Sequence, residues 1–280
     1  MTLSLSLSTG CLAHLPLRLA FRFAHEAGFD GLELVRTPAV AISGAGFVRR
    51  LSQQYNLPIL SVHPSVIPYP GYDRATKVLP ELVALAELTD SPLVVIHTPK
   101  EETLDHPKGR QFVDTLLRES ERAKPRVRIT LENAGFYRPA DKRYWLHDIG
   151  NLRSLADLYD LPLTFDTSHA GTTPLGLEDS YRLLRDRVVN VHFSDLRPRH
   201  LPPDWRPLYT ILAHHQMPGE GTLPLSQFVL ALLRHGYRGP LTFELSPVAL
   251  GGWSPPQITR RLRQSIQFVR QIESSYTSHA

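Results

Sequence analysis

Residues Ile129-Thr130-Leu131-Glu132 form a short apolar run, typical of a buried strand, that ends in a carboxylate able to bind a metal ion. Five other apolar runs end in the same way, in a histidine, an aspartate or a glutamate. Each of these residues therefore lies at the downstream end of a predicted strand. The other runs are Ile59-Leu60-Ser61-Val62 before His63, Leu93-Val94-Val95-Ile96 before His97, Leu163-Thr164-Phe165 before Asp166, Val189-Asn190-Val191 before His192, and Leu241-Thr242-Phe243 before Glu244.

The spacing of these residues fits a repeated strand-helix unit. The steps between them along the chain are 34, 35, 34, 26 and 52 residues. An eight-stranded β/α barrel of about 250 residues uses roughly 31 residues for each unit. The first four steps each fit one unit, and the last fits one unit with a long loop. The spacing therefore predicts that all these side chains meet at the carboxyl end of one barrel, where barrel enzymes carry their active sites.

The whole chain alternates between predicted strands and predicted helices. Residues 2–8 alternate apolar with polar side chains and predict a first strand, because they lack the basic start and the continuous apolar run of an export signal. Residues 31–35 predict the second strand. Strict alternation predicts an α/β fold, a single (β/α)8 TIM barrel over residues 1–280, whereas the alternative, an open doubly wound sheet, lacks its glycine-rich phosphate turn after the first strand. The predicted helices span residues 17–27, 47–55, 79–88, 112–123, 149–159, 177–184, 225–233 and 255–273.

Composition excludes several classes of protein. The chain has 31 Lys and Arg against 27 Asp and Glu, a formal net charge of +4, without a basic tract for a polyanionic partner such as DNA. The single cysteine, Cys11, excludes an internal disulfide framework and suits a reducing cytoplasmic location. No run of apolar residues is long enough to span a membrane. A cytoplasmic protein is therefore expected, and a homo-oligomer is compatible with these features.

The residue types at the predicted rim suit a transition-metal ion. Asp and Glu supply hard oxygen and His supplies nitrogen, a mixture that suits Zn²⁺, Mn²⁺, Fe²⁺ or Co²⁺ better than Ca²⁺. One histidine or glutamate at a strand end is usually structural. A whole set at one level of a barrel favours a metal site, because buried carboxylates are costly unless they are paired or metal-bound. We therefore expect one divalent ion, Zn²⁺ or Mn²⁺, or two.

Four motifs lie at the ends of predicted strands, and a fifth lies in the long connection between the seventh and eighth predicted strands. They are Leu131-Glu132-Asn133-Ala134-Gly135, Phe165-Asp166-Thr167-Ser168-His169-Ala170, Val191-His192-Phe193-Ser194-Asp195, Pro218-Gly219-Glu220-Gly221 and Phe243-Glu244. Together they resemble the xylose-isomerase-like barrel superfamily, which includes sugar isomerases and epimerases, inosose dehydratases and the endonuclease IV group. The resemblance covers nearly the whole chain. It implies a divalent metal held by Glu132, Asp166, His192 and Glu244.

In the isomerase and epimerase branch, the residues that match Glu132 and Glu244 also move the substrate proton. A sugar that offers its carbonyl and adjacent hydroxyl to the metal is polarised, so a carboxylate can remove a neighbouring carbon-bound proton. Glu132 and Glu244 can abstract and return that proton through a metal-stabilised enediolate. His169 is expected to contact a substrate oxygen or to be structural. The expected function is a divalent-metal-dependent isomerase or epimerase of a sugar, sugar phosphate or polyol.

A second interpretation comes from His63 and His97, which an isomerase with one metal does not need. The endonuclease IV group binds three metals, and similarity to it implies a first site of His63, His97 and Glu132 beside the second site of Glu132, Asp166, His192 and Glu244. The alternative function is therefore a metal-dependent AP endonuclease or phosphoester hydrolase.

The third metal site of that group is incomplete in this chain. His169 and His215 fit it, but Ala213 stands where the group has an aspartate. A third ion with two protein ligands would bind weakly, which disfavours phosphodiester cleavage. His214 is expected to be an exposed loop histidine instead of a replacement ligand.

Other residues favour a small-molecule substrate over nucleic acid. Glu33, within Gly28-Phe29-Asp30-Gly31-Leu32-Glu33-Leu34, resembles an acidic residue of the isomerase branch that faces the pocket, and its alternative role is a salt bridge between strands. No dense Lys/Arg stripe of a duplex-binding face is present. A non-catalytic metal-binding protein is disfavoured because both candidate proton-transfer glutamates are present. Loop residues able to cover a sugar or contact phosphates are Tyr69, Tyr72, Arg199, Trp205 and Arg206.

Overall fold

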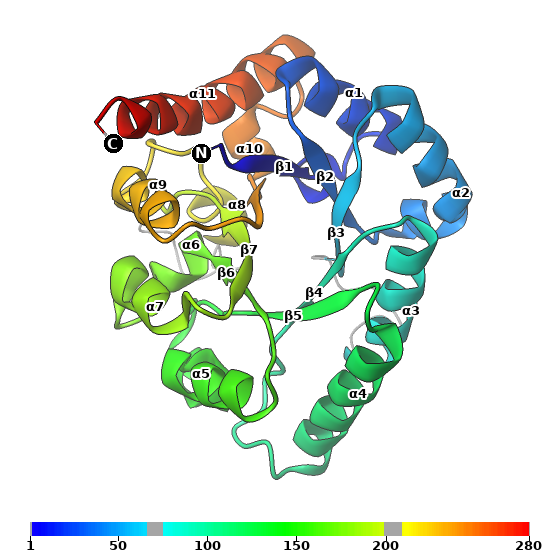
Figure 1. The fold of residues 1–280 in the computed structure, drawn as a ribbon, viewed down its shortest axis with the longest axis vertical. Helices are drawn as coiled ribbons and strands as arrows, with labels where there is room; N and C mark the ends of the chain where they lie inside the picture. Colours follow the sequence, from blue (N-terminus) through cyan, green and yellow to red (C-terminus); the bar gives the residue numbers. More distant parts are fainter. Residues whose placement is uncertain (1, 66–74, 199–208, 280) are drawn as a thin grey trace.

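Eight parallel strands close into a barrel, as the spacing predicts. A computed structural model describes residues 2–65, 75–198 and 209–279, with the strands in sequence order and helices around them (Figure 1). Strand β1 pairs with both β2 and β8, so the sheet has no free edge and the alternative of an open sheet is wrong. The strands are β1 Ser4–Ser8, β2 Gly31–Val35, β3 Ile59–His63, β4 Leu93–His97, β5 Arg128–Glu132, β6 Leu163–Asp166, β7 Val188–Phe193 and β8 Pro240–Phe243.

The helices follow the predicted order, but several begin earlier than predicted. Helix α2 begins at Pro38, where the Thr37 side chain accepts a hydrogen bond from the Val40 N–H (3.2 Å), and it bends at Gly44, where φ is 74°. Helix α4 also begins at a proline, Pro107. Proline suits the first turn because the N–H that it lacks would have no helical partner there. The long helices are α1 Leu17–Ala27, α2 Pro38–Tyr55, α3 Ala75–Leu88, α4 Pro107–Ala123, α5 Ile149–Leu158, α7 Gly176–Leu184, α9 Leu225–Arg234 and α11 Pro255–His279.

Short helices lie in the connections that follow the carboxyl ends of the strands. The sequence does not predict them, because three to five residues are too few to show an apolar period. They are η1 Thr9–Leu12 after β1, η2 Pro139–Arg143 and η3 Trp145–His147 after β5, α6 Thr167–Ala170 after β6, α8 Tyr209–Leu212 after β7, and α10 Pro247–Leu250 after β8. Among the described residues, no helix has the length and apolar character needed to cross a membrane.

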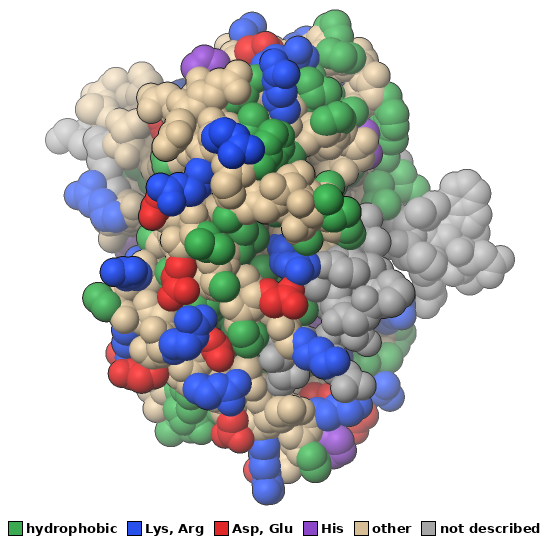
Figure 2. Space-filling model, turned by 90° about the vertical axis from the view of Figure 1, so that its right-hand side faces the viewer, with side chains coloured by type: hydrophobic (Ala, Val, Ile, Leu, Met, Phe, Trp, Pro, Cys, Tyr) green, Lys and Arg blue, Asp and Glu red, His purple; other side chains and the backbone are tan. Residues whose placement is uncertain are grey.

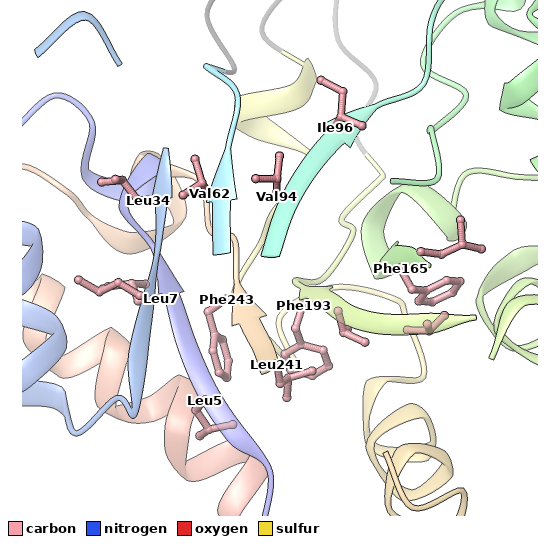
Figure 3. Close-up of a cluster of buried hydrophobic side chains, with 14 of the residues drawn as sticks. Leu5, Leu7, Leu34, Val62, Val94, Ile96, Phe165, Phe193, Leu241 and Phe243 are labelled. Carbon is pink, nitrogen blue, oxygen red and sulfur yellow. The ribbon is translucent and has the colours of Figure 1, made fainter. Parts of the chain in front are cut away.

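The apolar side chains of the strands pack outward against the helices. In strand β6, Phe165 stacks on Phe228 of α9 at a centroid distance of 5.6 Å and meets the Tyr181 ring of α7 edge to face at 5.5 Å. In the same core, Phe193 and Phe243 meet edge to face at 5.5 Å (Figure 3). These contacts show which side chains of each strand point outward, because alternate side chains of a strand point to opposite faces of the sheet. The residues between them must therefore face the inside of the barrel.

The inside of the barrel carries a buried, hydrogen-bonded polar layer. The hydroxyls of Thr130 and Thr164 lie 2.6 Å apart, Asn190 Nδ2 donates to Thr164 Oγ1 (3.3 Å), and Thr242 Oγ1 donates to Asn190 Oδ1 (3.4 Å). Residues two positions further along a strand share the same face. The next inward layer, at the carboxyl mouth, therefore consists of the predicted donors that lie two residues after these positions, which are Glu132, Asp166, His192 and Glu244.

Candidate metal centre

The carboxylate of Glu132 lies at the centre of a cluster that contains all the predicted strand-end donors. Its Oε2 atom lies 3.4 Å from His63 Nε2 and 3.4 Å from His97 Nε2. The Nδ1 atom of His63 is bonded to the Pro64 carbonyl (2.7 Å), so Nε2 is free to face Glu132. His63, His97 and Glu132 can offer donor atoms that all lie within 4.8 Å of one another. The three residues therefore form one possible cation-binding group.

A second group shares Glu132 and consists of residues from four consecutive strand ends. The donor atoms of Glu132, Asp166, His192 and Glu244 also lie within 4.8 Å of one another. His192 Nδ1 lies 3.1 Å from Glu244 Oε2 and 3.5 Å from Glu132 Oε1. The structure thus brings together the four residues that the sequence assigns to the principal metal site.

A third group lies beside the second and contains His169 and His215. With Asp166 they form a set of donors within 4.8 Å of one another. His169 Nδ1 is bonded to the Asn133 carbonyl (2.8 Å), and His215 Nδ1 lies 3.3 Å from Ser194 Oγ. Asp166 is thus the carboxylate in this group, while Ala213 stands where the resemblance implies an aspartate.

Local hydrogen bonds hold Asp166 in place between two of the motifs. Its backbone N–H donates to Asn133 Oδ1 (2.7 Å), and Asn133 Nδ2 donates to the Asp166 carbonyl (3.1 Å). The side chain also caps helix α6, since Oδ1 accepts from the His169 N–H (2.7 Å) and from Ser168 Oγ (3.1 Å). The Oδ2 atom remains available to bind a ligand. Asn133 and Ser168 therefore have a structural role, because they hold Asp166 in this orientation.

Glu33 lies deeper in the barrel than the other acidic residues. In the register between β2 and β3, Glu33 pairs with Ser61, while Val35 pairs with His63. Glu33 is fully buried, and its Oε2 accepts hydrogen bonds from Ser61 Oγ (2.9 Å) and from His192 Nε2 (2.9 Å). The pair with His192 agrees with the alternative role given for Glu33, a salt bridge between strands, and it places Glu33 in the layer below the donors.

The loop that carries His215 differs from the sequence-based expectation in the burial of His214. His214 is fully buried and meets the Tyr137 ring edge to face at 4.5 Å, so the prediction of an exposed loop histidine is wrong. Burial first, then the imidazoles of His215 and His169, lower the pKa of His214 and keep it neutral.

Asp195 is a structural residue whose role the sequence does not reveal. Its buried carboxylate accepts four backbone N–H groups, those of Leu196, Gly219, Gly221 and Leu223, at 2.8 to 3.0 Å. A Cβ atom on Gly221 would lie 2.2 Å from Asp195 Oδ1, so this approach requires glycine. The Pro218-Gly219-Glu220-Gly221 motif thus wraps around Asp195 and secures the segment that carries His215.

Opposite charges in the cluster shift pKa values in opposite directions. Burial raises the pKa of Glu132, but the nearby imidazoles, His192 first, outweigh burial and hold that pKa well below its usual range. Burial lowers the pKa of His192, but the carboxylates of Glu33, Glu132 and Glu244 outweigh burial and hold it well above its usual range. The same balance, with Asp166 and Glu132 as the partners, raises the pKa of His169 to about 10. Without a cation, these shifts favour ionised Glu132 together with protonated His169 and His192, and a divalent ion would displace the proton from an imidazole nitrogen that binds it.

Three buried atoms of the second group make no hydrogen bond within the part of the chain that the structure describes. They are Glu132 Oε1, Asp166 Oδ2 and His192 Nδ1. Oxygen and nitrogen lone pairs that face one another repel unless a proton or a cation lies between them. Carboxylate oxygen and imidazole nitrogen are the usual ligands of zinc and related divalent ions. The donor set therefore fits such an ion.

A cavity of about 540 Å³ lies at the opposite end of the barrel from this cluster. The first residues of β5 and β7, Arg128 and Val188, line it together with Arg185 and His235, which follow α7 and α9. Basic side chains at the carboxyl ends of helices are stabilised by the helix dipole. The helix dipole explains the position of these basic side chains, and we assign the cavity no part in the chemistry.

The loop residues Tyr69, Tyr72, Arg199, Trp205 and Arg206 lie outside the described residues.

Comparison with known proteins agrees with the barrel fold. The family model described as xylose isomerase-like TIM barrel matches residues 21–272. An uncharacterized protein of Mycobacterium tuberculosis is 27% identical over 289 residues, which cover 96% of this chain and 97% of the relative. The structure of E. coli 3-keto-D-glucoside 4-epimerase is similar with a TM-score of 0.70 at 17% identity, covering 96% of this chain and 100% of that chain. The structure of D-allulose 3-epimerase from Methylomonas sp. in complex with D-allulose has a TM-score of 0.69 at 18% identity, covering 96% of each chain.

Proposed function

The chain belongs to the xylose isomerase-like TIM barrel family, and on that basis we propose that it is a divalent-metal-dependent sugar isomerase or epimerase. The observation that carries the proposal is the convergence of Glu132, Asp166, His192 and Glu244, whose donor atoms lie within 4.8 Å of one another at the carboxyl end of the barrel. The names of the two similar epimerase structures support a sugar or keto sugar as the substrate class.

The four residues would hold one ion, Zn²⁺ or Mn²⁺, through three carboxylates and one imidazole. A bound divalent ion polarises a sugar carbonyl and its neighbouring hydroxyl, which makes the adjacent carbon-bound hydrogen acidic. The atoms without hydrogen bonds, Glu132 Oε1, Asp166 Oδ2 and His192 Nδ1, are the ones available as ligands. Asp166 and His192 are fully buried, so we assign them to holding the ion.

Glu132 and Glu244 are the candidates for proton transfer. Glu132 is the last residue of β5 and Glu244 follows β8, and β6 and β7 separate these strands in the barrel, so the two carboxylates approach the mouth from different sides. The side chain of Glu244 is 12% exposed and that of Glu132 is 1% exposed, so Glu244 is the more accessible to a substrate. We therefore assign Glu244 as the group that removes the proton and Glu132 as the group that returns it.

Hydrogen exchange between substrate and solvent tests these roles. Protein loaded with Mn²⁺ would be incubated with D-allulose or D-fructose in D₂O, and deuterium at the carbon next to the carbonyl would be measured by NMR. We expect Glu244→Gln and Glu132→Gln to lower exchange by at least 10²-fold, in line with the loss of a general base. The exposed Glu121→Gln on α4 is the control and should exchange like the wild type. Full exchange in Glu244→Gln would remove that residue from the proton path.

A second candidate function is supported by the group that contains His63 and His97. The two rings lie 4.8 Å apart at their centroids, and both face Glu132. Two neighbouring ions that share a carboxylate would suit phosphoester hydrolysis of the endonuclease IV type. On the face shown in Figure 2, Lys and Arg side chains are interspersed with Asp and Glu side chains, which gives a duplex no uniform basic track.

Metal stoichiometry separates the two functions. An isomerase that uses only the second group should retain one ion per chain, and a hydrolase that uses both groups should retain two. His97→Ala should leave an isomerase with its one ion per chain, and it should lower a hydrolase from two ions per chain to one. Nicking of a duplex with an abasic site at trace enzyme concentration would establish the hydrolase and exclude the isomerase as the main activity.

A further inference from the structure

The buried pair Glu33 and His192 connects two strands that are not neighbours in the barrel. Glu33 comes from β2 and His192 from β7, and both side chains are fully buried. His192 Nε2 lies 2.9 Å from Glu33 Oε2, and the other ring nitrogen, Nδ1, faces Glu244 and Glu132 at 3.1 and 3.5 Å. One edge of the imidazole therefore faces a carboxylate below it, while the opposite edge faces the donor cluster.

We propose that Glu33 is a positioning residue, which accepts the Nε2–H of His192 and thereby makes Nδ1 the metal ligand. This inference rests on the proposed function, because it assumes that a divalent ion occupies the group of Glu132, Asp166, His192 and Glu244. A neutral imidazole carries one proton, and the partner of the protonated nitrogen decides which nitrogen keeps its lone pair. Only the tautomer with hydrogen on Nε2 satisfies Glu33 and leaves Nδ1 free.

The layer that contains Glu33 holds its carboxylate in the orientation required. Ser61, its register partner on β3, donates its hydroxyl to the same Oε2 atom at 2.9 Å. Because Glu33 lies in the layer of Ser61 and not in the layer of His63, it cannot reach a substrate at the mouth without displacing His192. The structure thus assigns Glu33 to the support of a ligand instead of to the substrate.

A carboxylate in this position has two effects on a metal-bound imidazole. It fixes the ring angle, and its negative charge makes the facing nitrogen a stronger electron-pair donor. Loss of such a partner commonly weakens metal binding on the order of 10–100-fold. A glutamine keeps an acceptor oxygen but loses the charge, so it separates the two effects.

Calorimetric titration of metal-free protein with Mn²⁺ and with Zn²⁺ tests the proposal without an activity assay. We expect Glu33→Ala to weaken binding by about 10–100-fold and Glu33→Gln to weaken it less. Ser61→Ala, which removes only the hydrogen bond to Glu33, should produce a smaller loss. Glu273→Gln is the matched control, because Glu273 is a buried carboxylate in α11 that accepts the Leu3 N–H, and it should bind like the wild type.

The ligating nitrogen can be observed directly by NMR. Protein with ¹⁵N-labelled histidine and bound ¹¹³Cd²⁺ should show metal coupling at Nδ1 of His192, with Nε2 retaining its hydrogen. In Glu33→Ala the coupling should weaken or become averaged, because the ring loses the acceptor that fixes its orientation, whereas Glu33→Gln keeps an acceptor oxygen and should retain the coupling at Nδ1. A residue that only fills space would affect thermal stability and leave this signature unchanged.

The outcomes separate this proposal from the proposed function. Wild-type protein that binds neither ion would overturn both. Wild-type protein that binds an ion, with Glu33→Ala and Glu33→Gln binding equally tightly, would overturn the role of Glu33 alone. Coupling at Nε2 in place of Nδ1 would also overturn it. If Glu33→Ala does not fold, Glu33→Gln and Ser61→Ala carry the test, since each keeps the size of its site nearly unchanged.

Discussion

Replacing Asp195 by alanine should destabilise the protein by about 3–5 kcal/mol, because the substitution leaves several backbone N–H groups without a partner. The carboxylate accepts the N–H groups of Leu196, Gly219, Gly221 and Leu223, which belong to the loop around the Pro218-Gly219-Glu220-Gly221 motif. A single hydrogen bond to a charged group contributes roughly 1.5–3 kcal/mol, so a simple sum gives about 6–12 kcal/mol. Three of these four bonds are only part-buried, and water can replace the carboxylate there once the loop opens. The expected loss is therefore smaller than the sum.

Asp141 provides a matched comparison with half as many partners. Its Oδ2 accepts the N–H groups of Tyr137 (2.9 Å) and Arg138 (2.8 Å). Asp141→Ala should therefore destabilise by about half as much as Asp195→Ala. Asp195→Asn should fall between the wild type and Asp195→Ala, because one amide oxygen can still accept bonds while the NH₂ group faces two donors.

Thermal unfolding in the presence of a chelator measures these differences without a contribution from bound metal. For a domain of this size, 1 kcal/mol corresponds to roughly 2–4 °C in the midpoint. Asp195→Ala should thus lower the midpoint by about 6–20 °C. A change below about 2 °C, or an equal change in Asp141→Ala, would refute the idea that Asp195 anchors this loop.

Three further predictions concern residues elsewhere in the chain. Cys11 is buried and burial raises the pKa of its thiol, so the native protein should react with a thiol reagent far more slowly than protein in urea, and equal rates would contradict this burial. Burial lowers the pKa of His147 from 6.5 to about 4, so the unfolded state binds more protons between those pH values and stability should fall by up to about 3 kcal/mol as pH drops through that window. His147→Phe should lack this part of the pH dependence. Urea titrations at pH 6.5 and 4 give the free energy of unfolding, and the same difference between the two pH values in His147→Phe as in the wild type would disprove it. Adding Zn²⁺ at about 100 times its Kd should stabilise the wild type by about 2.7 kcal/mol, whereas Asp166→Asn should lose most of that gain in the same thermal assay.

The barrel and the convergence of its donors are predictable from the sequence because both follow from local signals. Six of the eight strands are apolar runs followed by a histidine, an aspartate or a glutamate, and the spacing between runs indicates the number of units. Helix starts are less predictable, since the first turns of α2 and α4 lack an apolar period. The Thr37-Pro38 and His106-Pro107 pairs are the signal that identifies those starts.

The depth of a residue in the barrel is harder to predict from sequence, because it depends on the register between strands. For Glu33 the sequence leaves open a pocket-facing role and a salt bridge between strands, and the pairing of β2 with β3 shows its depth in the barrel. His214 cannot be recognised as buried, because the fold of its loop depends on Asp195, which precedes it by nearly twenty residues. The role of Asp195 itself depends on four backbone groups, and a sequence pattern carries no information about them.

The two halves of the barrel contribute unequally to the centre at its mouth. Strands β5 to β8 and the residues just after them supply Glu132, Asp166, His192 and Glu244, whereas β2, β3 and β4 supply Glu33, His63 and His97. A polypeptide that begins at β5 would contain all four residues of the proposed metal site but none of the three side chains from β2, β3 and β4 that contact them. Substitutions in the first half should therefore change the affinity for metal ions and the number of ions bound, whereas substitutions in the second half should abolish activity.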